Sequence, residues 1–94
     1  MQIDRRVSSQ SFARHLGRWR EEIRGNLAST LAEQTRLMVL DGRLPVMTRL
    51  PSERSLAAVL AISRTTVATA YDLLRQCGFL QSQQGSGTWI ALPE

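Results

Sequence analysis

Hydrophobic residues recur along this chain at helical spacing, in stretches separated by turn-forming residues. In the first stretch, Phe12, Leu16, Trp19 and Ile23 follow one another at intervals of four, three and four residues. Such intervals place side chains on one face of a helix, and the charged residues between them mostly lie off that face. We therefore expect one amphipathic helix from residue 10 to residue 25.

A second helix is expected over residues 27–40. Its expected inward-facing positions are Leu27, Leu31, Thr35 or Leu37, and Met38. Asp41-Gly42 should end it, because glycine tolerates the left-handed conformation that closes helices. After Leu44-Pro45, which favours extended chain, residues 48–50 are expected to form a short strand.

Two further helices begin at serines eleven residues apart. Ser52, after Pro51, and Ser63, before Arg64, can each accept a hydrogen bond from a free backbone N–H of the first helical turn. The connection between these helices is short enough to require a tight bend, which predicts a helix-turn-helix whose second helix suits a DNA major groove. The expected buried positions are Leu56, Val59 and Leu60 in the first helix, and Val67, Ala70, Tyr71 and Leu74 in the second, over residues 64–77.

After Gly78 the hydrophobic period changes from helical to strand-like. Residues 79–83 and 88–92 are expected to be two short strands, joined by a loop at residues 84–87 that contains two glycines. The order of elements predicts an α+β, mostly α fold: a winged helix-turn-helix with a three-helix core, a C-terminal β-hairpin wing and an extra N-terminal amphipathic helix. We divide the chain into a basic extension (1–25), a DNA-binding domain (26–92) and the start of a linker (93–94).

The composition excludes several chemistries. All twelve basic residues are arginine, so no lysine amine is present for a Schiff base or for covalent pyridoxal phosphate. The single cysteine, Cys77, which we expect to be a small buried hydrophobe, excludes an internal disulfide and fits a reducing, cytoplasmic setting. With one histidine, His15, and scattered acids, we expect no metal site, no cofactor and no enzyme. No stretch is long and apolar enough for a membrane span or a signal peptide.

The net charge of +4 is unevenly distributed. Residues 1–25 hold six arginines against three acidic residues, whereas the remainder is nearly neutral. The case for DNA therefore rests on local placement, since Arg43, Arg49, Arg54 and Arg64 stand against Glu53 alone between residues 43 and 64.

Four linked motifs resemble the winged-helix domain of the GntR family of bacterial transcription regulators. They are Asp41-Gly42-Arg43-Leu44-Pro45, the run Thr48-Arg49-Leu50-Pro51-Ser52-Glu53-Arg54, Ser63-Arg64-Thr65-Thr66-Val67, and Gly85-Ser86-Gly87-Thr88. Residues 70–74 and 77–80 resemble the MocR branch, and residues 16–20 are similar to the lead-in of some actinobacterial-type members. The resemblance implies that a further domain of aminotransferase fold, which holds pyridoxal phosphate in that branch, is missing here and that this chain is a fragment.

The resemblance, together with side-chain chemistry, suggests where DNA is contacted. Arg64 can donate two hydrogen bonds to one guanine, worth about 1–3 kcal/mol of discrimination. Arg54 resembles the family arginine that reaches DNA from the preceding helix, with an ion pair to Glu53 or Asp72 as the alternative. The other candidates are Arg49 at phosphates, Ser63, Thr65 and Thr66 at the helix start, where local capping is an alternative, and Gln84 and Gly85 in the minor groove.

The sequence departs from the family pattern at one position and leaves two alternative functions open. Ala68 stands where many family members carry a groove-facing arginine, and Arg43 and Arg49 can compensate for it at phosphates or serve as plain surface residues. We expect sequence-specific binding to a double-stranded operator as a homodimer. A protein-interaction module using the Trp19 face, and sequence-blind nucleic-acid binding by residues 1–25, are the alternatives.

Overall fold

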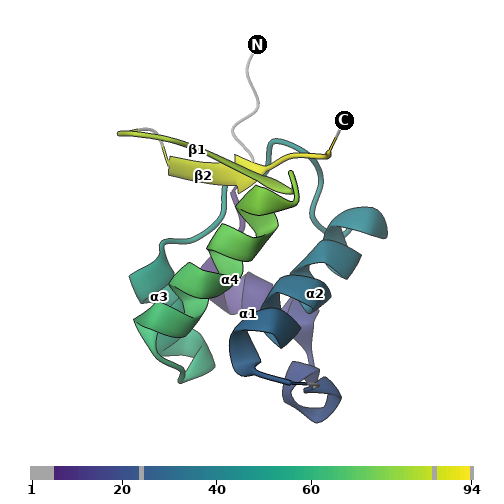
Figure 1. The fold of residues 1–94 in the computed structure, drawn as a ribbon, viewed down its shortest axis with the longest axis vertical. Helices are drawn as coiled ribbons and strands as arrows, with labels where there is room; N and C mark the ends of the chain where they lie inside the picture. The colour runs from purple at the N-terminus through teal and green to yellow at the C-terminus, as the bar shows by residue number, and fades with distance from the viewer. Residues whose placement is uncertain (1–5, 24, 86, 94) are drawn as a thin grey trace.

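Four α-helices, one short 3₁₀ helix and a two-stranded sheet are present in the computed structural model, which describes residues 6–23, 25–85 and 87–93 (Figure 1). In chain order they are α1 (Ser9–Leu16), the 3₁₀ helix η1 (Trp19–Glu22), α2 (Leu27–Leu40), α3 (Glu53–Leu60), α4 (Arg64–Gln76), β1 (Leu80–Gln83) and β2 (Gly87–Ile90). The hairpin lies across one end of the helices, and the fold is the expected mostly helical winged helix-turn-helix.

The serine signals for α3 and α4 are confirmed. The Ser55 N–H donates to the Ser52 hydroxyl oxygen at 3.1 Å, and the Thr66 N–H donates to the Ser63 hydroxyl oxygen at 3.0 Å. Each serine has extended backbone and so satisfies one of the free N–H groups of its helix. The same capping begins α1 at Ser8 and α2 at Asn26.

The prediction of one helix over residues 10–25 is wrong. Gly17 has a φ of +58° and ends α1, and the chain resumes as η1 two residues later. Phe12, Leu16 and Trp19 are buried as the spacing indicated, but Ile23 is 38% exposed. After the bend at Gly17, Trp19 is buried in the core as the first residue of η1 rather than as part of a continued α1.

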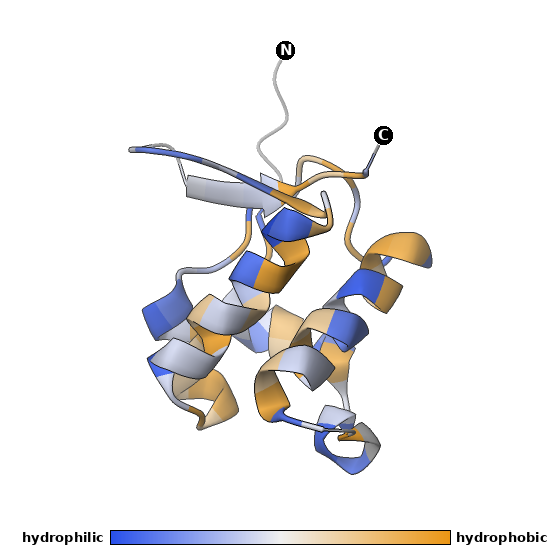
Figure 2. Ribbon diagram, in the orientation of Figure 1, coloured by the Kyte–Doolittle hydropathy of each residue, from blue (hydrophilic) through white to orange (hydrophobic). Residues whose placement is uncertain are grey.

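The core lies where α1, α2, α3 and α4 meet below the hairpin. Figure 2 shows hydrophobic colouring on all four helices, while the hairpin is mostly hydrophilic. The buried stripe of α4 is confirmed at all four expected positions, as are Leu56 and Leu60 of α3.

Two further burial predictions are wrong. Val59 is 38% exposed because it lies at the edge of the buried face of α3, and Cys77 is exposed beyond the end of α4. Of the two alternatives in α2, Leu37 is 39% exposed. In α2 the alternative to Leu37 is buried: Thr35 donates its hydroxyl to the Leu31 carbonyl at 2.7 Å.

The wing is an antiparallel hairpin in which Leu80 pairs with Ile90 and Gln83 with Gly87. Its strands are shorter than predicted, since residues 79, 91 and 92 lie outside them. Residues 48–50 form no separate strand, although Arg49 makes isolated bridges to Trp89 of β2 and to Arg6. Residues 48–50 therefore lie between β2 of the hairpin and the N-terminal segment.

The turn between α3 and α4 is held by an arginine from η1. Ala61, which ends α3, has a left-handed backbone with a φ of +58°, a conformation that favours glycine. The Arg20 guanidinium donates to the Leu60 carbonyl at 2.6 Å and to the Ala61 carbonyl at 3.3 Å. These bonds satisfy carbonyls that the helix end leaves free.

Replacing Arg20 by alanine is expected to lower the free energy of unfolding by about 1.5–3 kcal/mol, the value of a charge-assisted hydrogen bond. Changing Ala61 to glycine in that variant should restore about 1 kcal/mol by relieving the left-handed alanine. Urea unfolding measures both changes. The control is Arg18→Ala, because Arg18 is largely exposed and its 3.9 Å pair with Glu21 should contribute little. Equal losses for the Arg18 and Arg20 variants would contradict this role.

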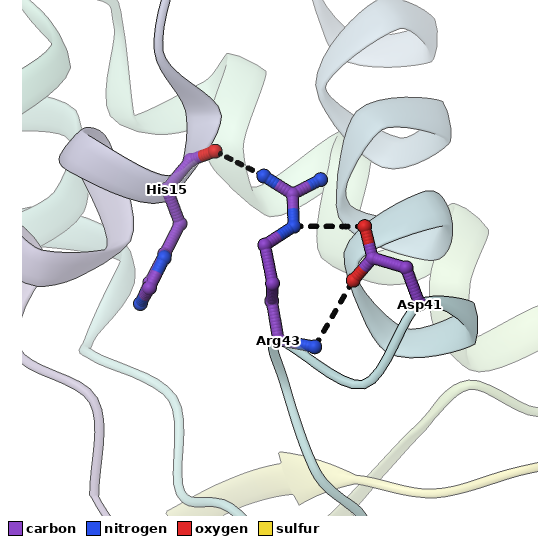
Figure 3. Close-up of polar contacts among 3 residues, drawn as sticks. All are labelled: His15, Asp41 and Arg43. Carbon is purple, nitrogen blue, oxygen red and sulfur yellow. Dashed lines mark hydrogen bonds and ion pairs between the residues drawn. The ribbon is translucent and has the colours of Figure 1, made fainter.

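Arg43 links two segments of the fold, although its side chain is 45% exposed. Its guanidinium donates to Asp41 at 2.8 Å and to the His15 carbonyl at the end of α1, also at 2.8 Å (Figure 3). Its backbone N–H donates to Asp41 at 3.0 Å, and these bonds hold the pKa of the Asp41 carboxyl below its ordinary value. The guanidinium joins α1 to the loop after α2, and the phosphate contact suggested for Arg43 stays a prediction.

Candidate nucleic-acid interface

The N-termini of α3 and α4 and the base of the wing enclose a groove of about 590 Å³, which we call the helix groove. It is lined by Leu50, Pro51, Ser52, Glu53, Arg54, Arg64, Tyr71, Gly87 and Thr88. Two of the predicted DNA-contacting residues, Arg54 and Arg64, therefore come together although they stand ten positions apart and on different helices.

Arg64 is the first residue of α4, and its side chain is 64% exposed. Its Nε lies 3.9 Å from a carboxylate oxygen of Glu53, the first residue of α3. Exposed pairs at this distance contribute about 0–1 kcal/mol, so the guanidinium can leave Glu53 for a stronger acceptor. A cation at a helix N-terminus is also unfavourable against the helix dipole, which an anionic ligand would relieve.

Arg54 lies in the first turn of α3 and is exposed. The alternative of an ion pair to Glu53 or Asp72 is not found, since Glu53 faces Arg64 and Asp72 pairs with Arg75. Within residues 6–23, 25–85 and 87–93, Arg54 has no hydrogen bond or ion pair, and its guanidinium is available to a ligand in the helix groove.

The residues at the start of α4 divide by their contacts. Ser63 and Thr66 are engaged with each other, because their hydroxyl oxygens lie 2.7 Å apart and Ser63 caps the helix. Thr65 between them is exposed. Local capping thus accounts for Ser63 and Thr66, while Thr65 keeps its side chain open to solvent.

The tip of the wing is exposed at Gln84 and Gly85. Gly85 has a φ of +80°, which a residue with a side chain rarely adopts, so glycine is required there by the turn itself. Ser86, the third residue of the predicted loop, lies outside the described residues.

Arg49 lies at the base of the wing, separate from the tip. A Cβ at Gly87 would stand 3.3 Å from the Arg49 Nε, so the arginine packs along glycine backbone at the start of β2. The side chain is half-exposed there. Arg49 and the helix groove therefore meet at Gly87, which also lines that groove.

Tyr71 is a site residue that the sequence identified only as part of the core. Its hydroxyl donates to the Pro51 carbonyl at 2.8 Å, so α4 fixes the loop that leads into α3. Burial raises the pKa of this hydroxyl well above its ordinary value, with the Glu53 carboxylate acting in the same direction. A tyrosine within an otherwise apolar stripe was the available signal, since a buried Tyr O–H needs an acceptor.

Metal chemistry finds no support in the described part of the chain. It contains no group of three or more histidine, cysteine, aspartate and glutamate residues that could hold an ion. His15 is exposed on α1. None of the described helices has the length and apolar character that crossing a bilayer requires.

Comparison with known proteins places this arrangement among bacterial regulators. The family described as "Bacterial regulatory proteins, gntR family" matches residues 27–90. The probable rhizopine catabolism regulatory protein MocR of Rhizobium meliloti is 49% identical over 61 residues, which are 65% of this chain and 12% of MocR. The pyridoxine biosynthesis transcriptional regulator PdxR of Corynebacterium glutamicum is 45% identical over 65 residues, 69% of this chain and 14% of PdxR. The chain thus corresponds to a small part of these relatives.

Solved structures agree with the sequence relatives. YtrA of Sulfolobus acidocaldarius, a GntR-family transcription factor, superposes with a TM-score of 0.68 at 28% identity, over 79% of this chain and 77% of YtrA. The AraR DNA-binding domain in complex with operator ORX1 superposes with a TM-score of 0.66 at 27% identity, over 74% of this chain and 84% of that domain.

Proposed function

The chain belongs to the gntR family of bacterial regulatory proteins and is a DNA-binding domain of that family, and we propose that it reads a double-stranded operator through α4 and the wing. The observation that carries this proposal is the pair of exposed guanidinium groups, Arg54 and Arg64, at one groove beside the wing. The AraR DNA-binding domain, which has a similar fold, is seen in complex with an operator, and this supports operator binding by the present fold.

In this proposal the N-terminal end of α4 enters the major groove. Arg64 donates to a guanine edge, and exposed Thr65 contacts a phosphate or a thymine methyl. Arg54 binds the phosphate backbone from α3, while Ser63 and Thr66 keep the end of α4 in shape. Gln84 and Gly85 reach the adjacent minor groove, where glycine allows close backbone approach. Arg49 holds a phosphate near the base of the wing.

We also propose that two copies bind a twofold-related operator, in the cytoplasm. A single copy offers few base contacts, whereas specific affinities usually need a larger interface. Two copies on half-sites about one helical turn apart would supply it.

Selection of bound duplexes from a random pool tests the proposal. We expect a recovered motif with a paired repeat, and binding that weakens steeply with salt because counterions are released from phosphates. The Arg75→Ala variant is the control and should recover the same motif, because Arg75 lies in the last turn of α4, away from the proposed base contacts, and pairs with Asp72. Recovery of no motif would contradict sequence-specific binding.

The two alternatives fare differently. A docking face at Trp19 is not favoured, because Trp19 is 4% exposed and part of the core. In residues 1–25, three arginines already have partners within the fold. Arg14 donates to Ser11, Arg18 pairs with Glu21, and Arg20 donates to the Leu60 carbonyl at the end of α3. Arg5 and Arg24 lie outside the described residues. Deleting this segment would also remove Phe12 and Trp19 from the core, so single substitutions are needed to test its binding.

A further inference from the structure

Glu53 is the one acidic residue among the described residues that line the helix groove. A carboxylate repels phosphates, so it is an unexpected neighbour for the guanidinium groups of a groove proposed to bind DNA. Glu53 is the first residue of α3, where an acid interacts favourably with the helix dipole. That role accounts for an acid in the first turn of α3, but not for its position against Arg64, which begins the next helix.

We propose that Glu53 is a specificity-determining residue that makes Arg64 bind a guanine edge in preference to a phosphate, an inference that rests on the function proposed above. Guanine offers uncharged acceptors, O6 and N7, in the major groove, whereas a phosphate carries a full negative charge. A carboxylate 3.9 Å from the Arg64 Nε therefore repels an approaching phosphate much more strongly than a guanine. Glu53 thus weakens the contact that every DNA sequence offers more than the contact that one base offers.

The ion pair leaves the end of the Arg64 guanidinium open to a base. Its Nε faces the carboxylate, and among the described residues the guanidinium has no hydrogen bond and no other ion pair. The two terminal nitrogens can therefore donate to guanine O6 and N7 while Nε stays beside Glu53. The Arg64 side chain is 64% exposed and that of Glu53 is 30% exposed. The arginine is thus the more accessible member of the pair, as a DNA contact supported by a positioning residue should be.

Both members of the pair stand on backbone that the fold already fixes. Ser52 caps α3 through the Ser55 N–H, and Ser63 caps α4 through the Thr66 N–H. Tyr71 of α4 donates to the carbonyl of the residue before Ser52 at 2.8 Å, so the starts of the two helices are tied to each other. The carboxylate is therefore in place before DNA arrives, and holding the arginine costs little further ordering.

The test measures dissociation constants of the full chain for the selected operator and for an unrelated duplex over a series of salt concentrations. Glu53→Gln removes the charge and keeps the size of the side chain. Affinity for the unrelated duplex should rise by about two- to fivefold more than affinity for the operator, the effect of one exposed charge pair. For the unrelated duplex the slope of log K against log salt should steepen by about 0.9, because Arg64 gains a phosphate contact. The operator slope should change less.

Two comparisons separate this role from a general effect of charge. In the Arg64→Ala variant, Glu53→Gln should cause no further loss of preference between the duplexes, since the residue that it directs is gone. Glu33→Gln is the matched control, because it removes the same charge from α2, where Glu33 pairs with Arg36 and does not line the helix groove. Its preference and slopes should equal those of the unchanged chain.

An equal rise in affinity for both duplexes in Glu53→Gln would overturn the inference while leaving operator binding in place. An effect of Glu53→Gln on preference that is as large without Arg64 as with it would do the same. If the unchanged chain bound neither duplex, or bound both equally, the proposed function would fail, and the inference with it.

Discussion

Replacing Trp19 by alanine is expected to lower the free energy of unfolding by about 3–5 kcal/mol, the cost of removing a large buried aromatic side chain. Trp19 belongs to the same core cluster as Phe12 and Leu16, and η1 packs against α2. Domains of this size often have only about 5–15 kcal/mol of stability, so this single change would remove a large share of it. Urea unfolding followed by far-UV circular dichroism measures the loss.

Trp89→Ala supplies the matched control, since the second tryptophan is only half-buried on β2. We expect it to cost clearly less than the Trp19 change. Equal small losses for the two variants would contradict the conclusion that the segment ahead of the family match is part of the folded core.

Arg64→Ala is expected to reduce affinity for the selected operator by about fivefold to 160-fold, which corresponds to the 1–3 kcal/mol of a bidentate guanine contact. Affinity for unrelated duplexes should fall much less, so that the sequence preference is lost at one base pair of each half-site. The free energy of unfolding should change by less than about 0.5 kcal/mol, because the side chain is exposed. Fluorescence anisotropy with both duplexes measures these differences.

Arg36→Ala controls for the change in net charge. Arg36 pairs with Glu33 on α2 and lies near Cys77, at the opposite end of α4 from Arg64. It should leave operator preference unchanged. A comparable loss of preference in both variants would mean that overall charge, rather than a base contact at Arg64, governs recognition.

The sequence predicted the elements whose signals are local. Serine caps located the starts of α3 and α4, and the glycine after the last helix located the wing. The stripe of α4 followed from spacing alone. Short-range hydrogen bonds and helical periodicity determine these features, so a single sequence contains them.

The remainder depends on contacts between distant segments. The spacing of Phe12, Leu16 and Trp19 satisfies the core whether the helix continues or breaks at Gly17, so periodicity could not distinguish the two. Arg20 reaches a carbonyl forty residues away, and the bridge between Arg6 and Arg49 joins segments that no local signal links. These pairings appear only once the fold brings the segments together.

The central claim is that the N-terminal end of α4 reads a base edge in the major groove, and interference by guanine N7 methylation tests it most directly. N7 lies on the major-groove edge that an arginine contacts. The account predicts that methylation at one or more guanines in each half-site of the selected operator prevents binding of the unchanged chain, and that Arg64→Ala becomes insensitive to at least one of them. Binding that tolerates methylation at every guanine N7 of the operator would contradict it.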